Sequence, residues 1–256
     1  MAFFDKHLIS IIKSNFNTDP NRILDIGCGD GRLLKIFSSI FKNSDLVGQE
    51  VIDGETKIRF IDPEVSKNHY WSQDLSLNED QNYDLRGITD KNKIKIIQNN
   101  VNNDWPIEDS SIDVITSNMV LEHVQDFDLF AKNMKRVMSK DSIAIHIVPT
   151  SASLWEGHIK QPLSHRIKSE NWIKFCYSIG LGIRSERTPA EWSKMFKNEF
   201  FYRPESEINK ALSSKREYDF AMLALRVFNK NFYNLKFKLP FSNIFIPSTL
   251  ITRKIK

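Results

Sequence analysis

An acidic residue followed by alternating glycines stands near the start of the chain. Asp25 is the second-last residue of a short apolar run that ends at Ile26, and Gly27, Gly29 and Gly31 follow that run. Glycine lets a ligand approach the backbone closely, because it has no Cβ. Open α/β sheets bind their ligands at turns of this kind, outside the carboxyl ends of strands. A dinucleotide fingerprint needs a third glycine at position 32, where the chain has Arg32, so the pattern is G-x-G-x-G instead.

A second acidic residue follows at the end of the next apolar run. Glu50 stands 19 residues after Gly31. In nucleoside-binding sheets an acid at the end of the second strand accepts hydrogen bonds from ribose hydroxyls, and one carboxylate can accept two. The two patterns together predict a site for a nucleoside-containing ligand.

The segment from Leu24 to Gly31 resembles the first motif of the class I S-adenosylmethionine-dependent methyltransferases, in which a strand and an acid precede G-x-G-x-G. Residues 111–124, which end in Leu-Glu-His-Val, resemble the fourth strand and following turn of that family, particularly its broad small-molecule and lipid branch. The resemblance covers residues 22–148. It implies a Rossmann-like domain, S-adenosylmethionine as the cofactor and methyl transfer as the activity.

The resemblance also implies which residues bind the cofactor. Many members have an Asp after the third strand; here the position falls near Asn100 and Val101, and the Asn side-chain oxygen can still accept a hydrogen bond. Cys28 is interpreted as a small packing residue, because methyl transfer needs no enzyme thiol. The expected cofactor-binding residues are Asp25, Gly27, Cys28, Gly29, Gly31, Glu50, Asn100, Val101, Ser117, Asn118 and Met119.

Methyl transfer is an in-line displacement, in which the protein mainly aligns donor and acceptor. A base is needed only where the acceptor loses a proton, as a hydroxyl does. The candidates are His158 and His165, seven residues apart, with Arg166 as an anchor for an anionic group. His123 is a third candidate, and its alternative is a packing role. No metal-ligand spacing is recognisable, so no metal is predicted.

The periodicity of apolar residues predicts an α/β fold, with a doubly wound and mostly parallel sheet. Helices are expected over residues 3–16, 32–41 and 126–138. Strands are expected over residues 22–26, 45–50, 93–98, 112–117 and 142–148.

The pattern changes after Pro149, and this change predicts the domain organisation. Residues 1–150 are expected to form the Rossmann-like, S-adenosylmethionine-binding domain, with a possible insertion over 51–92. Residues 151–204 are expected to form a largely helical cap for the acceptor, with helices over 172–179 and 190–200. Residues 205–256 are expected to return to the core sheet, through helices over 205–213 and 218–228 and an extended segment over 244–255.

Charge is distributed unevenly along the chain. Residues 1–150 hold 17 Lys and Arg against 23 Asp and Glu, whereas residues 151–256 hold 19 against 9. The basic second part favours an anionic acceptor by steering, although a solvated basic surface explains it equally well. No DNA partner is expected, and RNA is not excluded. No apolar run is long enough for a membrane span, and two cysteines with no signal-peptide pattern favour the cytoplasm.

These observations predict a methyltransferase that acts on a small molecule, on oxygen, with a glycan or natural-product precursor as the candidate acceptor. Two alternatives stay open. One is methylation of RNA or protein, which the basic second part permits. The other is a non-catalytic protein that binds S-adenosylmethionine as the partner of another enzyme.

Overall fold

The structure is a computed structural model that describes residues 3–29, 31–50, 94–184, 187–218 and 248–254. By its internal contacts the chain divides into two compact units. The first contains Met1–Asn118, Asp126–Ile145 and Thr252–Lys256, and the second contains Met119–Gln125 and His146–Ile251. Among the described residues, no helix has the length and apolar character needed to cross a membrane.

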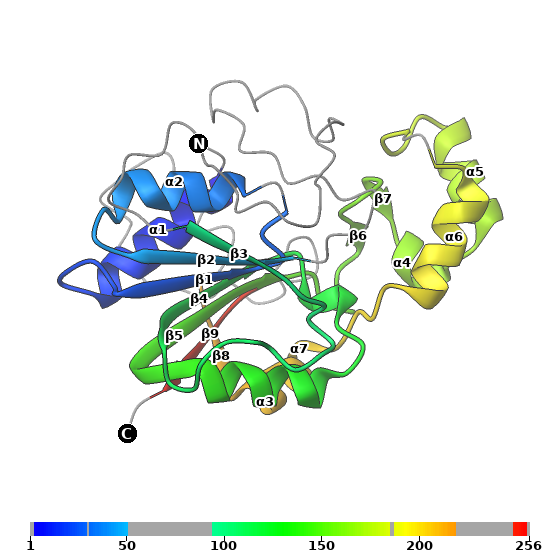
Figure 1. Ribbon diagram of the computed structural model, residues 1–256. Helices are drawn as coiled ribbons and strands as arrows, with labels where there is room; N and C mark the ends of the chain where they lie inside the picture. Colours follow the sequence, from blue (N-terminus) through cyan, green and yellow to red (C-terminus); the bar gives the residue numbers. More distant parts are fainter. Residues whose placement is uncertain (1–2, 30, 51–93, 185–186, 219–247, 255–256) are drawn as a thin grey trace. The chain divides into compact units, whose positions relative to one another are not determined.

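A seven-stranded, mostly parallel sheet runs through the fold in the order β3-β2-β1-β4-β5-β9-β8 (Figure 1). The strands are β1 (Arg22–Ile26), β2 (Asp45–Glu50), β3 (Ile94–Gln98), β4 (Ile112–Asn118), β5 (Met138–Val148), β8 (Ser214–Tyr218) and β9 (Ser248–Lys254).

The strand order reverses between β1 and β4, and this switch point is where doubly wound sheets bind ligands. Both β2 and β4 pair with β1 in parallel, and Ile26 lies opposite Gln49 on one side and Ser117 on the other. The carboxyl ends of the three strands therefore share one edge. Glu50 and Asn118 are the last residues of β2 and β4, and the Gly-rich turn follows β1, so all three lie at that edge.

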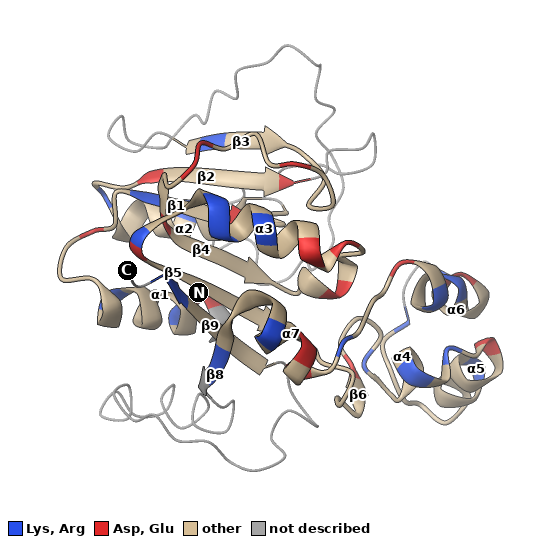
Figure 2. Ribbon diagram, turned by 90° about the horizontal axis from the view of Figure 1, so that it is seen from below, with Lys and Arg blue, Asp and Glu red and all other residues tan. Residues whose placement is uncertain are grey.

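Three helices cover the sheet in the first unit. Figure 1 shows α1 (Phe3–Asn15) and α2 (Arg32–Ile40) on one face and α3 (Phe127–Val137) on the other. Asp126 caps α3 by accepting a 2.9 Å hydrogen bond from the Leu129 N–H. Figure 2 shows acidic residues at the start of α3 and basic ones further along, the order that favours a helix dipole.

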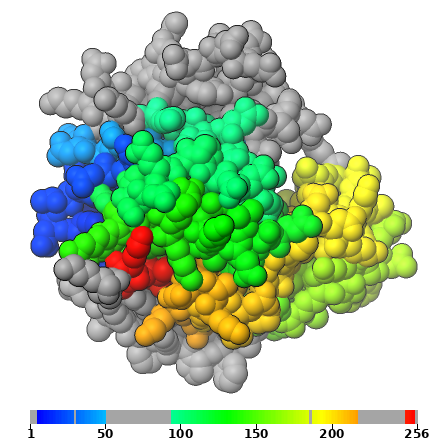
Figure 3. All heavy atoms as spheres, turned by 60° about the horizontal axis from the view of Figure 1, so that its bottom comes forward, coloured from blue at the N-terminus to red at the C-terminus, as the bar shows by residue number. Residues whose placement is uncertain are grey.

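The last described residues are tied to the same unit. Figure 3 shows the red C-terminal segment against the green of α3 and β5. There the Lys254 ammonium donates to the carbonyls of Lys135 (3.1 Å) and Met138 (2.7 Å). The chain thus closes its C-terminal strand onto the helix-to-strand corner between α3 and β5.

Gly48 sets how closely the α2 helix approaches the sheet. It lies in β2 opposite Asp25 and Ile96. A Cβ at this position would stand 2.7 Å from the Cys28 sulfur and from terminal methyls of Leu34 and Ile96. The absence of a side chain at Gly48 therefore makes room for the Gly-rich turn and for the core side of α2.

The second unit contains a short hairpin and a helical group. The hairpin pairs β6 (Trp155–Glu156) with β7 (Gln161–Pro162). The helices are α4 (Ser164–Ile167), α5 (Glu170–Ser178), α6 (Pro189–Asn198) and α7 (Glu205–Leu212). An aromatic core holds part of this unit, and its buried members are Ile159, Ile173, Trp192, Phe196 and Phe200.

The strands and helices expected from periodicity are present, with ends shifted by a few residues. Three differences concern short or polar elements. The β5 strand begins at Met138, directly after α3, rather than at residue 142. The β6–β7 hairpin and β8 were not expected at all. The expected insertion over 51–92 and nearly all of the expected helix over 218–228 lie outside the described residues.

One carboxyl group is buried within the sheet itself. Asp25 is 3% exposed, and its Oδ1 accepts a 2.8 Å hydrogen bond from the hydroxyl of Thr116, the residue opposite it in β4. Burial raises the pKa of Asp25 from 3.8 to about 7, and the hydrogen bond from Thr116 offsets only part of this effect.

We expect Gly48→Ala to destabilise the protein by about 1–3 kcal/mol, because the added methyl overlaps three buried groups in a packed core. The control is Gly157→Ala, whose Cβ would meet the flexible end of Met119 at 3.1 Å. Denaturant unfolding of both variants measures the difference. Equal stability of Gly48→Ala and wild type would show that α2 can move away from the sheet without cost.

We expect the stability of the protein to carry a pH dependence from Asp25. Between about pH 4 and pH 7 the folded state binds the Asp25 proton and the unfolded state releases it, so this contribution falls as pH rises. Asp25→Asn keeps an acceptor for Thr116 but removes the charge. The variant should therefore gain stability over wild type with rising pH, by at most about 1.4 kcal/mol per pH unit. The matched change at the exposed Asp128 should give no such trend.

Candidate functional site

The Gly-rich turn is held by backbone hydrogen bonds to β2. The N–H groups of Gly27 and Cys28 donate to the Gln49 carbonyl at 2.8 and 3.2 Å, and the Gly31 N–H donates to the Cys28 carbonyl at 3.0 Å. Gly27, Gly29 and Gly31 have φ values of 64°, 54° and 75°. Three left-handed residues at alternate positions explain why the sequence has glycine at each.

Glu50 closes the turn from the side of β2. Its Oε2 accepts a 2.7 Å hydrogen bond from the Gly29 N–H. A Cβ built on Gly29 meets no atom of the described residues within 4 Å, so those residues leave open space in front of the turn. Glu50 thus has a structural contact that the sequence did not suggest, and it lies beside the open space where a ligand can reach its carboxylate.

The electrostatics of this edge suit a cation. Burial is the main cause of the raised pKa of Asp25, and the charge of Glu50 raises it further, whereas the hydrogen bond from Thr116 lowers it. The effect of Glu50 on Asp25 indicates that the two acids lie near each other. S-adenosylmethionine carries a sulfonium and an ammonium group. Asn118 Oδ1 is buried and has no hydrogen-bond partner among the described residues, which leaves an acceptor at the end of β4. The open turn, the acids and this acceptor fit the cofactor that the sequence resemblance implies.

The remaining residues that are expected to bind the cofactor differ in exposure, hydrogen bonding and backbone conformation. Asn100 is exposed, and its Oδ1 accepts hydrogen bonds from the N–H of Asn102 (2.9 Å) and from the Asn102 side chain (3.0 Å). Val101 and Ser117 are buried. Met119 has a φ of 59°, which non-glycine residues seldom adopt, directly after β4. Their contacts with the cofactor stay predictions.

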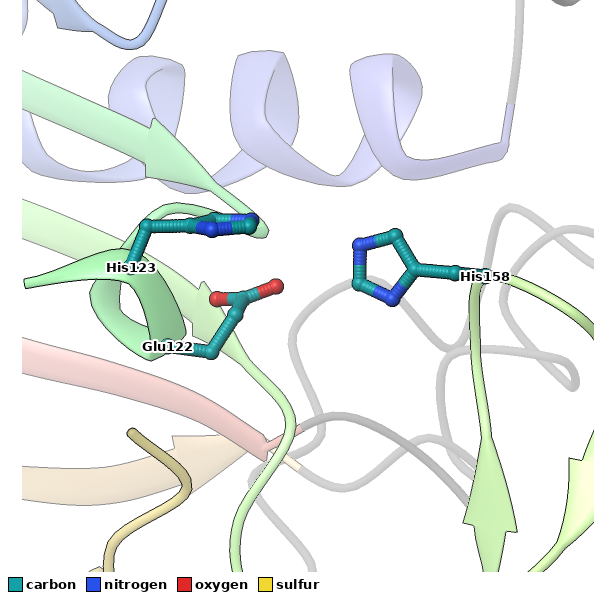
Figure 4. A group of neighbouring side chains, drawn as sticks. All are labelled: Glu122, His123 and His158. Atoms are coloured by element: carbon teal, nitrogen blue, oxygen red, sulfur yellow. The ribbon is translucent and has the colours of Figure 1, made fainter. Parts of the chain in front are cut away.

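A second group of polar residues lies within the second unit. Glu122 and His123 form the short 3-10 helix η2 (Leu121–His123), and His158 follows the first strand of the hairpin. Figure 4 shows the three side chains directed toward one another, with ligand-type atoms within 4.8 Å of each other. We call Glu122, His123 and His158 the histidine cluster. The structure therefore brings together two of the three expected catalytic histidines.

His158 is oriented by a buried glutamate. Glu156 is fully buried, and its Oε1 accepts hydrogen bonds from the His158 ring Nδ1 (2.6 Å), the His158 N–H (3.0 Å) and the Tyr202 hydroxyl (3.0 Å). Its Oε2 accepts from the Ile159 N–H at 2.7 Å. Burial alone lowers the pKa of His158, but the hydrogen bond and charge of Glu156 outweigh it and raise that pKa.

The Glu122 carboxylate does not receive hydrogen bonds of the kind that Glu156 accepts. It is 1% exposed, and neither carboxylate oxygen accepts a hydrogen bond from another residue in the part of the chain that the structure describes. Burial raises its pKa to about 7, with the charge of His158 acting in the opposite direction. The protein around the His123 ring, and then His158, lower the pKa of His123 to about 4, although the residue as a whole is exposed.

Segment 199–203 fixes the cluster in place. The Phe201 N–H donates to the Glu122 carbonyl at 2.6 Å, and the Arg203 guanidinium donates to the carbonyls of Val124 (2.8 Å) and Gln125 (3.0 Å). The Phe200 ring packs against both imidazoles, with centroids 4.6 Å from His123 and 4.7 Å from His158. The positions of both rings thus depend on a segment more than forty residues further along the chain.

His165 and Arg166 lie outside the histidine cluster. His165 is buried against the Tyr202 ring at 4.6 Å, and burial lowers its pKa to about 4. Arg166 is exposed and donates from Nε to the Ser151 carbonyl at 2.8 Å. The structure therefore separates His165 from His158, with β7 and the start of α4 between them. Their roles in catalysis and acceptor binding stay predictions.

Sequence reasoning missed Glu122, Glu156 and Tyr202. Two of them had a local signal, because Glu122 directly precedes His123 and Glu156 precedes His158 by two residues. A carboxylate beside a histidine in sequence can orient it or share a ligand with it. Tyr202 had no such signal, since its contact with Glu156 spans 46 residues.

Comparisons with known proteins identify the family and the fold. A family model described as a methyltransferase domain matches residues 4–222. No curated protein matches the sequence. Among solved structures, the plantazolicin methyltransferase BpumL in complex with a monoazolic desmethylPZN analog and SAH is similar over 99% of this chain and 83% of its own, with 14% identity and a TM-score of 0.52.

A second similar structure is the phosphoethanolamine N-methyltransferase 2 of Haemonchus contortus, in complex with phosphomonomethylethanolamine and S-adenosylhomocysteine. The similarity covers 98% of this chain and 53% of that one, with 11% identity and a TM-score of 0.53. At such identities the two structures establish the fold. With the family match over most of its length, the chain belongs to the methyltransferase-domain family and is an S-adenosylmethionine-dependent methyltransferase of class I.

Proposed function

We propose that this methyltransferase acts on a hydroxyl group of a small-molecule acceptor, and that the histidine cluster holds the reacting oxygen. The observation that carries the proposal is the buried carboxylate of Glu122, which faces two imidazoles and accepts no hydrogen bond from another described residue. Buried polar groups without partners are rare, and a ligand is one way to satisfy them. An acceptor hydroxyl supplies the missing donor.

The chemistry follows from what S-adenosylmethionine supplies, which is a methyl group on a positively charged sulfur. In the transfer, a carbon–oxygen bond forms as the carbon–sulfur bond breaks, and the sulfur leaves as a neutral thioether. The acceptor oxygen gives up its proton, which needs an acceptor nearby. The histidine cluster offers one carboxylate and two imidazoles for this purpose. Its aromatic neighbour Phe200 shields one side from water.

The cofactor, in this proposal, is bound by the turn and the two acids of the first unit. The turn leaves backbone N–H groups and open space at Gly29, and Glu50 receives ribose hydroxyls while it holds the Gly29 N–H. Asn118 adds an acceptor at the end of β4. Ser117, the preceding residue of β4, and Met119, the following residue, are further candidates for contact with the cofactor.

The acceptor is proposed to carry a negative charge at a distance from the reacting hydroxyl. The excess of Lys and Arg over residues 151–256 and the exposed guanidinium of Arg166 support this view. The histidine cluster itself does not, because Glu122 and Glu156 are two buried carboxyl groups. A phosphate or carboxylate would therefore bind outside the cluster.

We expect the wild-type chain to bind S-adenosylmethionine in the micromolar range, which corresponds to about −8 kcal/mol at 1 μM. Glu50→Gln should weaken binding at least tenfold, because an amide has one neutral acceptor oxygen where a carboxylate has two charged ones, and one acceptor is already used by the Gly29 N–H. Calorimetric titration measures this change. Glu108→Gln is the control, since that side chain is 87% exposed. Wild-type affinity in Glu50→Gln would contradict the assigned role of Glu50.

We expect the purified chain to transfer a labelled methyl group to a small-molecule fraction of a cell extract. Glu122→Gln, which keeps the shape of the side chain, should lower kcat by about 10²-fold or more, because it removes the charge beside the reacting oxygen. Glu170→Gln, a change at a partly exposed position in the same unit, should retain activity. Label found in RNA or protein instead would point to those acceptors, and no turnover with any acceptor would favour a non-catalytic role.

A further inference from the structure

We propose that Glu122, His123 and His158 form a binding site for a divalent transition-metal ion of the Zn²⁺ class. Two imidazoles and one carboxylate are a ligand set that catalytic zinc uses, with a fourth position open for water or substrate. The candidate ligand atoms of the three side chains lie within 4.8 Å of one another. Bonds of about 2.0–2.2 Å to one ion would bring such atoms on the order of 3–4 Å apart. The side chains therefore need to close only slightly.

The surroundings of His158 are those of a metal ligand. In such sites the second ring nitrogen usually donates to a carboxylate or a backbone carbonyl, which fixes the ring and leaves the first nitrogen for the metal. His158 Nδ1 contacts Glu156 Oε1 at 2.6 Å. Glu156 in turn is held by Tyr202 and by two backbone N–H groups. Nε2 of His158 is then the nitrogen left for a ligand.

His123 has the corresponding arrangement with a backbone group. Its ring makes a hydrogen bond with the backbone of Glu199, which leaves one ring nitrogen for an ion. Phe200, the next residue, packs against the rings of both His123 and His158. Segment 199–203 thus provides both the hydrogen bond and the apolar contact that orient the two imidazoles.

Glu122 supplies the charge. Its carboxylate is 1% exposed, and no other described residue donates a hydrogen bond to it. A buried carboxylate without a partner is costly, whereas a carboxylate that coordinates a metal is stabilised. Because His123 is exposed, an ion can reach the cluster from solvent.

The donor atoms select the kind of ion. Imidazole favours Zn²⁺, Fe²⁺, Ni²⁺ and Cu²⁺, whereas Mg²⁺ and Ca²⁺ favour sites made entirely of oxygen. Two nitrogens and one carboxylate therefore favour the first group. This inference departs from the sequence-based expectation of no metal, because adjacent Glu122 and His123 and the distant His158 do not form a recognisable ligand spacing.

The inference deepens the proposed function and rests on it for the role of the ion, though not for its binding. A divalent ion lowers the pKa of a bound hydroxyl and fixes its position. The acceptor oxygen would then take the open coordination position. Binding of the ion and transfer of the methyl group are separate measurements, so either can fail alone.

The test is metal binding by the full chain after removal of metal with a chelator. We expect one equivalent of Zn²⁺ to bind and to raise the melting temperature. Co²⁺ added to the metal-free chain in place of Zn²⁺ should give the visible absorption of a low-symmetry nitrogen–oxygen site. Glu122→Gln should weaken Zn²⁺ binding at least tenfold, and His158→Gln should do the same. Glu170→Gln, the same change at a partly exposed position, should leave Zn²⁺ binding unchanged.

The folding of each variant is checked by its unfolding transition, and binding is judged only for variants that fold as wild type does. No Zn²⁺ or Co²⁺ binding by the folded wild-type chain would overturn the proposal, as would wild-type affinity in a folded Glu122→Gln. The opposing account is a proton held between Glu122 and His158, and it predicts the first of these results. If the metal-free chain still transfers labelled methyl at the wild-type rate, methyl transfer stands and the role of the ion falls.

Discussion

Removal of carboxylates from water is the constraint on which the functional parts of this structure depend. Glu156, Asp25 and Glu122 are all almost fully buried, yet they differ in the donors that they receive. Glu156 accepts four hydrogen bonds, and Asp25 accepts one from Thr116. Glu122 accepts none from another described residue. The free-energy cost of removing a carboxylate from water is therefore least compensated at Glu122. A buried carboxylate of this kind is more typical of functional sites than of stable cores.

Residues of both candidate sites lie at or just after the ends of strands, but different interactions hold the two sites in position. The Gly-rich turn is positioned by neighbours in the sheet, since Gly27 and Cys28 donate to Gln49 in the adjacent strand. Parallel pairing brings the carboxyl ends of those strands to one edge of the sheet, and this does not depend on the conformation of the loops. The histidine cluster instead depends on hydrogen bonds from Phe201 and Arg203, which lie in an irregular segment. The first arrangement suits a cofactor shared by a whole family, and the second suits an acceptor that differs between members.

These two means of positioning explain what the sequence could predict. The strand before the turn, β1, is buried from Ile23 to Ile26 and is apolar there apart from Asp25. The turn itself needs three glycines with positive φ. Such local requirements are visible in a sequence. The β8 strand is polar, Ser-Lys-Arg-Glu-Tyr, and the β6–β7 hairpin has two residues on each side, so neither has a detectable period. The pairing of His123 with His158 could not be predicted, because Phe200 and the Glu199 backbone create it across the chain.

His165 shows the limit of reasoning from spacing alone. A separation of seven residues places two side chains on one face of a helix, but residues 158–165 contain the end of a hairpin and the first residues of a four-residue helix. His165 consequently packs on Tyr202, while His158 joins Glu122 and His123. The connection between them is Tyr202, whose hydroxyl donates to Glu156.

The excess of basic residues over 151–256 favours an anionic acceptor, whereas the buried acids of the histidine cluster oppose one. Which effect is stronger depends on how far each set of charges lies from a given part of the acceptor. The excess of basic residues over 151–256 acts through solvent, where a Debye length of about 8 Å screens it at physiological salt. Glu122 and Glu156 are buried, so their effect within the cluster is screened much less. In the proposed mechanism the local acids dominate at the reacting oxygen, and they favour a neutral hydroxyl or one bound to a cation. Arg166 is exposed, so its charge acts on groups outside the cluster. An acceptor with an anionic group at one end and a hydroxyl at the other satisfies both.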